Sequence, residues 1–124
     1  MRAALLAACA AGAAACTSIG DEKVAGWPEL RVVEHYVPHA AMRERCARWG
    51  MAPIACAEFD FAALECHLWF SNEYPPSRGV LLHERKHCEG YDHPDETNMA
   101  DAWERWQRQQ LSAAAAEPSG AASQ

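Results

Sequence analysis

The chain lacks the features of a membrane-spanning or nucleic-acid-binding protein. Its one long apolar run, residues 3–15, is too short to cross the roughly 30 Å hydrocarbon core of a bilayer as a helix. Positive charge is scarce, since 11 Lys and Arg residues stand against 17 Asp and Glu residues and the net charge is −6. Without a basic patch, nucleic acid is not an expected partner. No internal repeat is present, and 124 residues fit one domain at most.

The N-terminal segment has the pattern of a secretion signal over residues 1–16. Arg2 precedes the apolar run, which ends in small residues and a cysteine before the chain turns polar. This pattern resembles the signals of bacterial lipoproteins, in which such a cysteine is lipidated and becomes the new N-terminus. The resemblance implies a lipid anchor at Cys16, or at Cys9 if the true start lies upstream, and cleavage without lipid is the alternative. We therefore expect export to the cell envelope, facing the periplasm or the cell exterior.

The remaining chain divides by composition into three parts. Residues 17–26 are polar and contain glycine, which predicts a tether. Residues 112–124 are small or polar without an apolar pattern, which predicts a disordered tail. A folded domain is expected over residues 27–111.

Four cysteines fall within the expected domain: Cys46, Cys56, Cys66 and Cys88. An even number in an oxidising compartment predicts disulfides, and three pairings are possible. We favour Cys46 with Cys56, which would tie a helix end to the next strand, and Cys66 with Cys88, which would tie a strand to a histidine-rich helix. Reduced thiols and a cysteine-ligated metal are the alternatives, and the lack of any CxxC spacing argues against such a metal.

The residue patterns predict an α+β fold, in which a small antiparallel sheet of two to three strands packs with an N-terminal helix, a histidine-rich helix and a C-terminal helix. β-branched residues and polar–apolar alternation predict the strands, at residues 30–38, 54–61 and 65–71. Helical spacing of apolar residues and turn signals predict the helices, at residues 39–50, 78–89 and 95–111. The second helix has Ser77 as an N-cap and Gly90 as a stop, and Met99, Trp103 and Trp106 share one face of the third.

Residues 83–94, HERKHCEGYDHP, concentrate metal-binding side chains. Residues four apart on a helix project to the same side, so His83 and His87 can bind one ion. Glu84 is rotated by about 100° from His83, within reach of a metal-bound water. Gly90 lets the chain reverse, so that His93 can return as a third ligand. Three protein ligands with an open fourth position are typical of catalytic zinc, whereas structural zinc is closed by four.

The spacing His83-Glu84-x-x-His87-x-x-Gly90-x-x-His93 matches the long zinc-binding motif of the metzincin metallopeptidases at every specified position. The proline after His93 resembles the serralysin branch, and the resemblance covers about twelve residues. It implies that His83, His87 and His93 bind one Zn²⁺ and that Glu84 is the catalytic general base. Glu84 would take a proton from the metal-activated water that attacks a peptide carbonyl, and would later protonate the leaving amine.

The substrate-binding groups are less defined. In zinc peptidases of this kind an edge strand near the helix holds the substrate chain, and residues 66–71 are the candidate, with His67 or Trp69 on the exposed side. Three tyrosines are candidates for binding the oxyanion: Tyr36, Tyr74 and Tyr91. The other histidines, His35, His39 and His67, are expected to be ordinary solvated or partly buried side chains.

These observations predict an exported zinc metallopeptidase or peptidase-like hydrolase that acts on a peptide or protein substrate. The alternative is a non-enzymatic envelope lipoprotein whose metal site stabilises a domain that is otherwise too small. A third possibility is a component of an envelope or transfer apparatus that binds partners through the tryptophan-rich last helix.

Overall fold

The computed structural model describes residues 18–47 and 53–118. The expected signal, with Cys9 and Cys16, and the end of the first predicted helix lie outside the described residues. All three expected strands and all three expected helices are present in the parts described. The α+β class is therefore confirmed.

The sheet has three strands, β1 (Arg31–Val37), β2 (Ala55–Asp60) and β3 (Glu65–Ser71), in the order β1-β3-β2. β2 and β3 form the expected antiparallel pair. β1 pairs in parallel with β3, so the sheet is mixed and not purely antiparallel. The chain reverses direction between β1 and β2 and again between β2 and β3, so β3 runs in the direction of β1 when it takes the place beside it.

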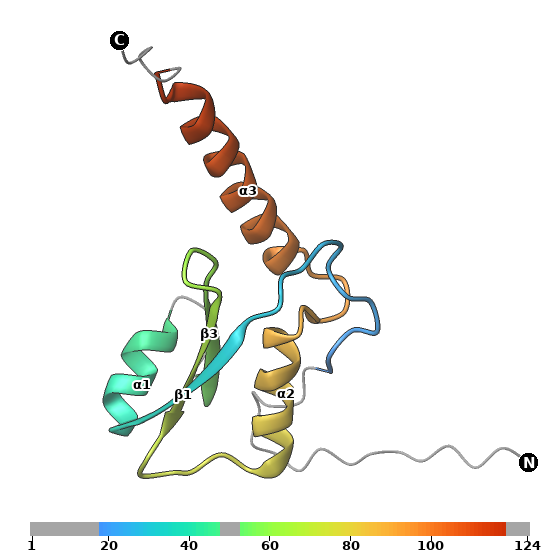
Figure 1. Ribbon diagram of the computed structural model, residues 1–124. Helices are drawn as coiled ribbons and strands as arrows, with labels where there is room; N and C mark the ends of the chain where they lie inside the picture. Colours follow the sequence, from blue (N-terminus) through green and yellow to red (C-terminus); the bar gives the residue numbers. More distant parts are fainter. Residues whose placement is uncertain (1–17, 48–52, 119–124) are drawn as a thin grey trace, which may run out of the picture.

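The helices are α1 (His39–Cys46), α2 (Arg78–Cys88) and α3 (Asn98–Ala116). Figure 1 shows α1 and α2 on opposite sides of the sheet, with α3 projecting away from the rest of the molecule. Among the described residues, no helix combines the length and the apolar character needed to cross a bilayer.

Two apolar clusters lie on the two faces of the sheet. On the α2 side, β3 contributes three fully buried side chains: Cys66, Leu68 and Phe70. Trp27, which precedes β1, and Trp103, from α3, also belong to this larger cluster. The Trp27 ring meets the Phe61 ring edge-on at a centroid distance of 5.2 Å. On the α1 side, the smaller cluster joins Met42, Cys46 and Cys56 to Trp69. Successive side chains of β3 therefore point to opposite faces of the sheet, so that the strand packs against α2 on one face and against α1 on the other.

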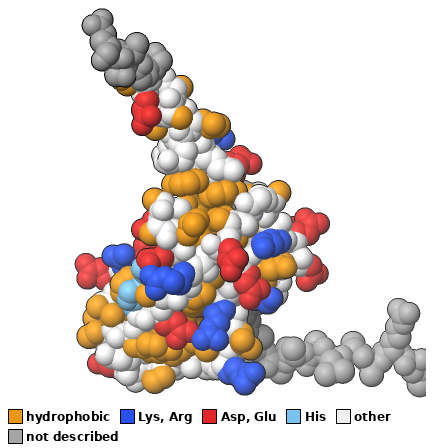
Figure 2. Space-filling view, viewed as in Figure 1, with side chains coloured by type: hydrophobic (Ala, Val, Ile, Leu, Met, Phe, Trp, Pro, Cys, Tyr) orange, Lys and Arg blue, Asp and Glu red, His pale blue; other side chains and the backbone are white. Residues whose placement is uncertain are grey.

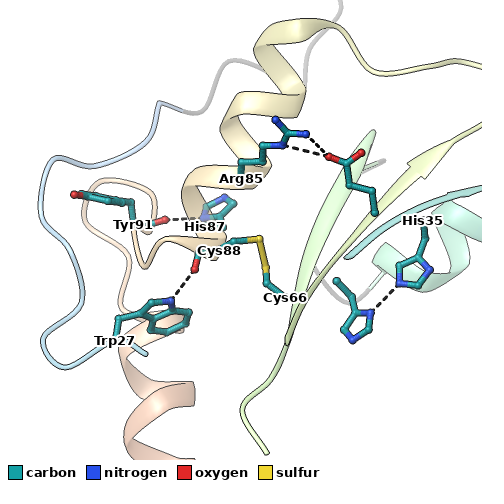
Figure 3. Close-up of a disulfide and its surroundings, with 9 residues drawn as sticks. Trp27, His35, Cys66, Arg85, His87, Cys88 and Tyr91 are labelled. Carbon is teal, nitrogen blue, oxygen red and sulfur yellow. Dashed lines mark hydrogen bonds and ion pairs between the residues drawn. A yellow bond between two sulfur atoms is a disulfide. The ribbon is translucent and has the colours of Figure 1, made fainter. Parts of the chain in front are cut away.

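Both favoured disulfides are present. Cys46–Cys56 ties the end of α1 to β2, and Cys66–Cys88 ties the central strand to the end of α2. Figure 3 shows the second disulfide crossing between β3 and α2 beside His87.

The ends of the domain differ from the prediction. α3 begins at Asn98 and not near residue 95, because Asp95 has a φ of 62° and cannot be helical. It continues to Ala116 and not only to Leu111, since alanine is the strongest helix former and residues 113–116 are all alanine.

The segment expected as a tether is also attached to the domain. Gly20 N–H donates to the Asp92 carbonyl at 2.8 Å, Val24 N–H donates to the Gly90 carbonyl at 2.9 Å, and Lys23 forms an antiparallel bridge with Tyr91. This attachment cannot be predicted from amino-acid composition, because backbone groups and not side chains form its hydrogen bonds.

Candidate metal centre

α2 carries the candidate site and has defined ends. Ser77 Oγ accepts from Val80 N–H at 3.3 Å, as expected of an N-cap. At the other end Gly90 has a φ of 101°, its N–H donates to the His87 carbonyl, and Tyr91 N–H donates to the Lys86 carbonyl. These two bonds form a Schellman motif, in which the glycine reverses the chain. The reversal sends the following residues back along the helix towards the histidines.

The three predicted ligands are brought together. Nε2 of His83 lies 3.1 Å from Nε2 of His93 and 3.2 Å from Nε2 of His87. One ligand atom from each histidine lies within 4.8 Å of the others, and no fourth His, Cys, Asp or Glu joins the group among the described residues. Two nitrogens bound to one tetrahedral zinc at about 2.0–2.1 Å would lie about 3.3–3.4 Å apart. The spacing therefore suits a single ion.

Hydrogen bonds fix the tautomers of two ligands. His87 Nδ1 lies 2.8 Å from the Tyr91 carbonyl oxygen, and His93 Nδ1 lies 2.9 Å from Glu96 Oε2. Because both oxygens accept, each Nδ1 carries the proton and each neutral Nε2 presents a lone pair. The single Nε2–H of His83 can donate to only one of these two nitrogens, Nε2 of His87 or Nε2 of His93. A shared cation would satisfy all three nitrogens.

Burial favours the metal-binding form of the helix histidines. It lowers the pKa of His87 to about 4, and burial together with the neighbouring His93 lowers the pKa of His83. Both imidazoles are therefore neutral at neutral pH, and the neutral imidazole is the form that binds a metal.

Glu84 is buried on the face of α2 that packs against the larger apolar cluster. Val80 and Cys88, one turn away in each direction, pack in the larger apolar cluster, and Glu84 is 8% exposed. Burial raises the pKa of its carboxyl to about 7. The carboxylate makes no hydrogen bond or ion pair with any other described residue. A buried carboxyl without a partner is costly, which makes Glu84 a functional-site candidate.

Trp27 holds the end of α2 in place. Its indole Nε1–H donates to the Cys88 carbonyl at 2.9 Å (Figure 3). This carbonyl is one of the last in the helix and has no partner within it. Together with the Cys66–Cys88 disulfide, the bond fixes the helix turn that carries His87.

The charged residues inside the motif face away from the site. Arg85 and Lys86 are exposed, and they pair with Glu34 and Glu89 respectively. Figure 3 shows the Arg85 guanidinium reaching across to a carboxylate on β1, which is that of Glu34. The pair ties the outer side of α2 to the sheet.

The remaining histidines lie apart from the three ligands. His35 Nε2 and His67 Nδ1 are 2.8 Å apart on the α1 side of the sheet, and the His35 ring stacks on Trp69 at a centroid distance of 4.0 Å. His39 begins α1 and meets the Tyr74 ring edge-on. They are partly buried, as expected.

One expectation about substrate binding is wrong. β3 is the central strand, so residues 66–71 are not a free edge, because both of their neighbours are already paired. Among the tyrosines predicted as oxyanion binders, the Tyr36 hydroxyl donates to Glu34 Oε2 at 3.2 Å, Tyr74 is exposed, and the backbone carbonyl of Tyr91 contacts His87 Nδ1. Their role in oxyanion binding stays a prediction.

Three groups that contact the predicted ligands were not predicted from the sequence: the Tyr91 carbonyl, Asp92 and Glu96. A backbone carbonyl leaves no mark in a sequence. The sequence does contain a signal for Glu96, because Pro94-Asp95 is a pair typical of turns and a turn there brings residue 96 back beside His93.

Comparisons of the chain with family models, with curated proteins and with solved structures found no match.

Proposed function

We propose that the protein is a zinc-dependent metallopeptidase or peptidase-like hydrolase of the cell envelope. One observation carries the proposal: the Nε2 atoms of His83, His87 and His93 converge, and the buried, unpartnered carboxyl of Glu84 follows the first of them on α2. Three protein ligands leave a coordination position for water or substrate.

The donor set favours zinc over magnesium and calcium. Imidazole suits Zn²⁺, whereas Mg²⁺ and Ca²⁺ prefer oxygen ligands. All four cysteines of the described domain are in disulfides, so no thiolate competes for the site. When bound, the ion would lower the pKa of a water molecule to about 7. Glu84 accepts the proton and later returns it to the leaving amine.

An edge of the sheet supplies a place for an extended substrate. β1 and β2 each pair on one side only among the described residues, and α2 packs against β2. We assign the edge of β2 to the substrate chain, which would join the sheet by strand addition. This replaces the central strand β3 in that role.

The attachment of the N-terminal segment limits the distance between the metal centre and a lipid anchor. If Cys16 is lipidated, only three residues lie between it and Gly20, whose N–H donates to the Asp92 carbonyl beside His93. The four residue-to-residue steps from Cys16 to Gly20 span at most about 14 Å when extended. The metal centre would then lie close to the membrane surface, and its substrates would be chains within reach of that surface.

A structural role for the metal is the competing function. The ion would join α2, through His83 and His87, to the start of the loop that leads into α3, through His93. Such a cross-link would stabilise a small domain directly.

The two functions separate in one experiment on the full chain in mild detergent. Zinc content and cleavage of a broad peptide library are measured for the wild type, Glu84→Gln and the control Glu89→Gln, which changes an exposed carboxylate that pairs with Lys86. An enzyme holds one zinc in all three proteins and loses cleavage only in Glu84→Gln. Metal without cleavage supports the structural role, and a wild type without metal excludes both.

A further inference from the structure

A second group of metal-binding side chains adjoins the first and shares His93 with it. Ligand atoms of Asp92, His93 and Glu96 lie within 4.8 Å of one another. His93 Nδ1 is 2.9 Å from Glu96 Oε2 and 3.8 Å from Asp92 Oδ1. The group could hold a second cation, or it could support the first site.

Asp92 is already engaged by backbone donors. Its Oδ1 accepts from His93 N–H at 2.8 Å, and its Oδ2 accepts from Met99 N–H at 2.9 Å. The second bond satisfies a free N–H in the first turn of α3, where Thr97 provides no side-chain cap. Asp92 therefore fixes the loop to α3 and is poorly placed to serve as an ion ligand.

The chemistry of His93 also opposes a second ion. Its Nε2 faces His83 in the main cluster. A neutral imidazole that gives Nε2 to a metal keeps its proton on Nδ1. That proton lies on the side of Glu96, where a second cation would have to replace it.

A tight turn brings Glu96 into position. Glu96 N–H donates to the His93 carbonyl at 3.2 Å, Pro94 follows His93, and Asp95 has a φ of 62°. Proline at the second position and a left-handed residue at the third define a type II turn. Asn98 Nδ2 donates to Glu96 Oε2 at 3.3 Å and helps to hold the carboxylate.

We propose that Glu96 is the positioning residue of the metal centre, fixing His93 as the third ligand by accepting its Nδ1–H. This inference rests on the proposed metal centre. A carboxylate in this position sets the ring orientation and tautomer and raises the basicity of the ligand. Glu96 acts through His93 and touches neither metal nor substrate.

The test compares metal binding by the full chain in mild detergent for the wild type, Glu96→Ala, Glu96→Gln and Glu104→Ala. Glu104 is a control because it is an exposed glutamate of α3 that pairs with Arg108. Zn²⁺ affinity is measured by competition with a chromophoric chelator, and Co²⁺ substitution reports the ligand geometry through its visible spectrum.

Glu96→Ala is expected to weaken Zn²⁺ binding by about 10- to 100-fold and to change the Co²⁺ spectrum. Glu96→Gln, whose amide oxygen can still accept from Nδ1–H, is expected to recover part of the affinity, and Glu104→Ala to match the wild type. If Glu96→Ala fails to fold, Glu96→Gln alone tests the inference, because the inference requires this variant to bind Zn²⁺ more weakly than the wild type.

Unchanged affinity and spectrum in the Glu96 variants would overturn the inference while leaving the metal centre in place. Two ions per chain, with the second lost in Glu96→Gln, would also overturn it in favour of a second cation site. A wild type that binds neither metal would instead remove the metal centre itself.

Discussion

Gly90 and Trp27 are packed so closely that no side chain fits at position 90, where an added Cβ would lie 2.6 Å from Cγ of Trp27. The same glycine has a φ of 101°. Gly90→Ala therefore combines a clash with a left-handed backbone, and we expect it to lower the free energy of unfolding by about 2–3 kcal/mol. Urea unfolding measures the change.

A second glycine on α2 provides the control. Gly79 lies in the first turn of α2, where an added Cβ would have Ser77 Oγ at 3.8 Å, an ordinary contact. Gly79→Ala should be neutral or stabilise the protein by up to about 1 kcal/mol. Equal destabilisation by both substitutions would show that the Trp27 contact has no special role.

The ligands should be separable from the other histidines by substitution. His93→Ala removes one of three ligands, so its effect on Zn²⁺ affinity should exceed the roughly 10- to 100-fold effect of losing a supporting group. His35→Ala changes a histidine on the opposite face of the sheet and should leave the affinity unchanged. Chelator competition measures both, and an equal loss in the two variants would contradict the assignment of ligands.

The histidine motif could be predicted because local helix geometry determines most of it. Residues 83 and 87 share a helix face in any α-helix, and Gly90 signals the reversal that returns His93. The paired disulfides also followed from local reasoning. β-branched residues and polar–apolar alternation likewise located β1, β2 and β3.

The order of the strands could not be predicted in this way. Which strand is central depends on packing between distant segments, and the apolar residues of β3, which face both helix layers, are compatible with either an edge or a centre. The attachment of Gly20 and Val24 to the ligand loop was also hidden, because backbone groups make it and any sequence can supply them.

The two disulfides should have similar effects on stability and different effects on metal binding. Their sequence separations are 10 and 22, and because loop-closure entropy rises only with the logarithm of loop length, removing either by a double Cys→Ala substitution should cost about 3 kcal/mol. Only Cys66–Cys88 adjoins His87. Its removal should weaken Zn²⁺ binding, whereas removal of Cys46–Cys56, on the α1 side, should not. Equal metal affinity in the two folded double variants would contradict this role.

The ion pair between Arg85 and Glu34 should make a pH-dependent contribution to stability. The hydrogen bond from Arg85 lowers the pKa of Glu34 below its ordinary value of 4.5, despite partial burial. A carboxyl with a lowered folded-state pKa stabilises the protein above its ordinary pKa, and this contribution is lost as the pH falls through the lowered value.

Because the pair is partly exposed, Glu34→Gln should cost no more than about 1 kcal/mol at pH 7. The difference from the wild type should vanish in acid, below the lowered pKa. Urea unfolding of the metal-free chain across this range measures it, and a difference that grows towards low pH would have the wrong sign.

The ligand set itself provides the most direct test of the metal centre. X-ray absorption spectroscopy of the zinc-loaded full chain reports the number and type of ligand atoms. We predict three imidazole nitrogens at about 2.0–2.1 Å and one further light atom from water, with one imidazole lost in His93→Ala. A sulfur ligand near 2.3 Å, or a spectrum that His93→Ala leaves unchanged, would contradict the three-histidine centre.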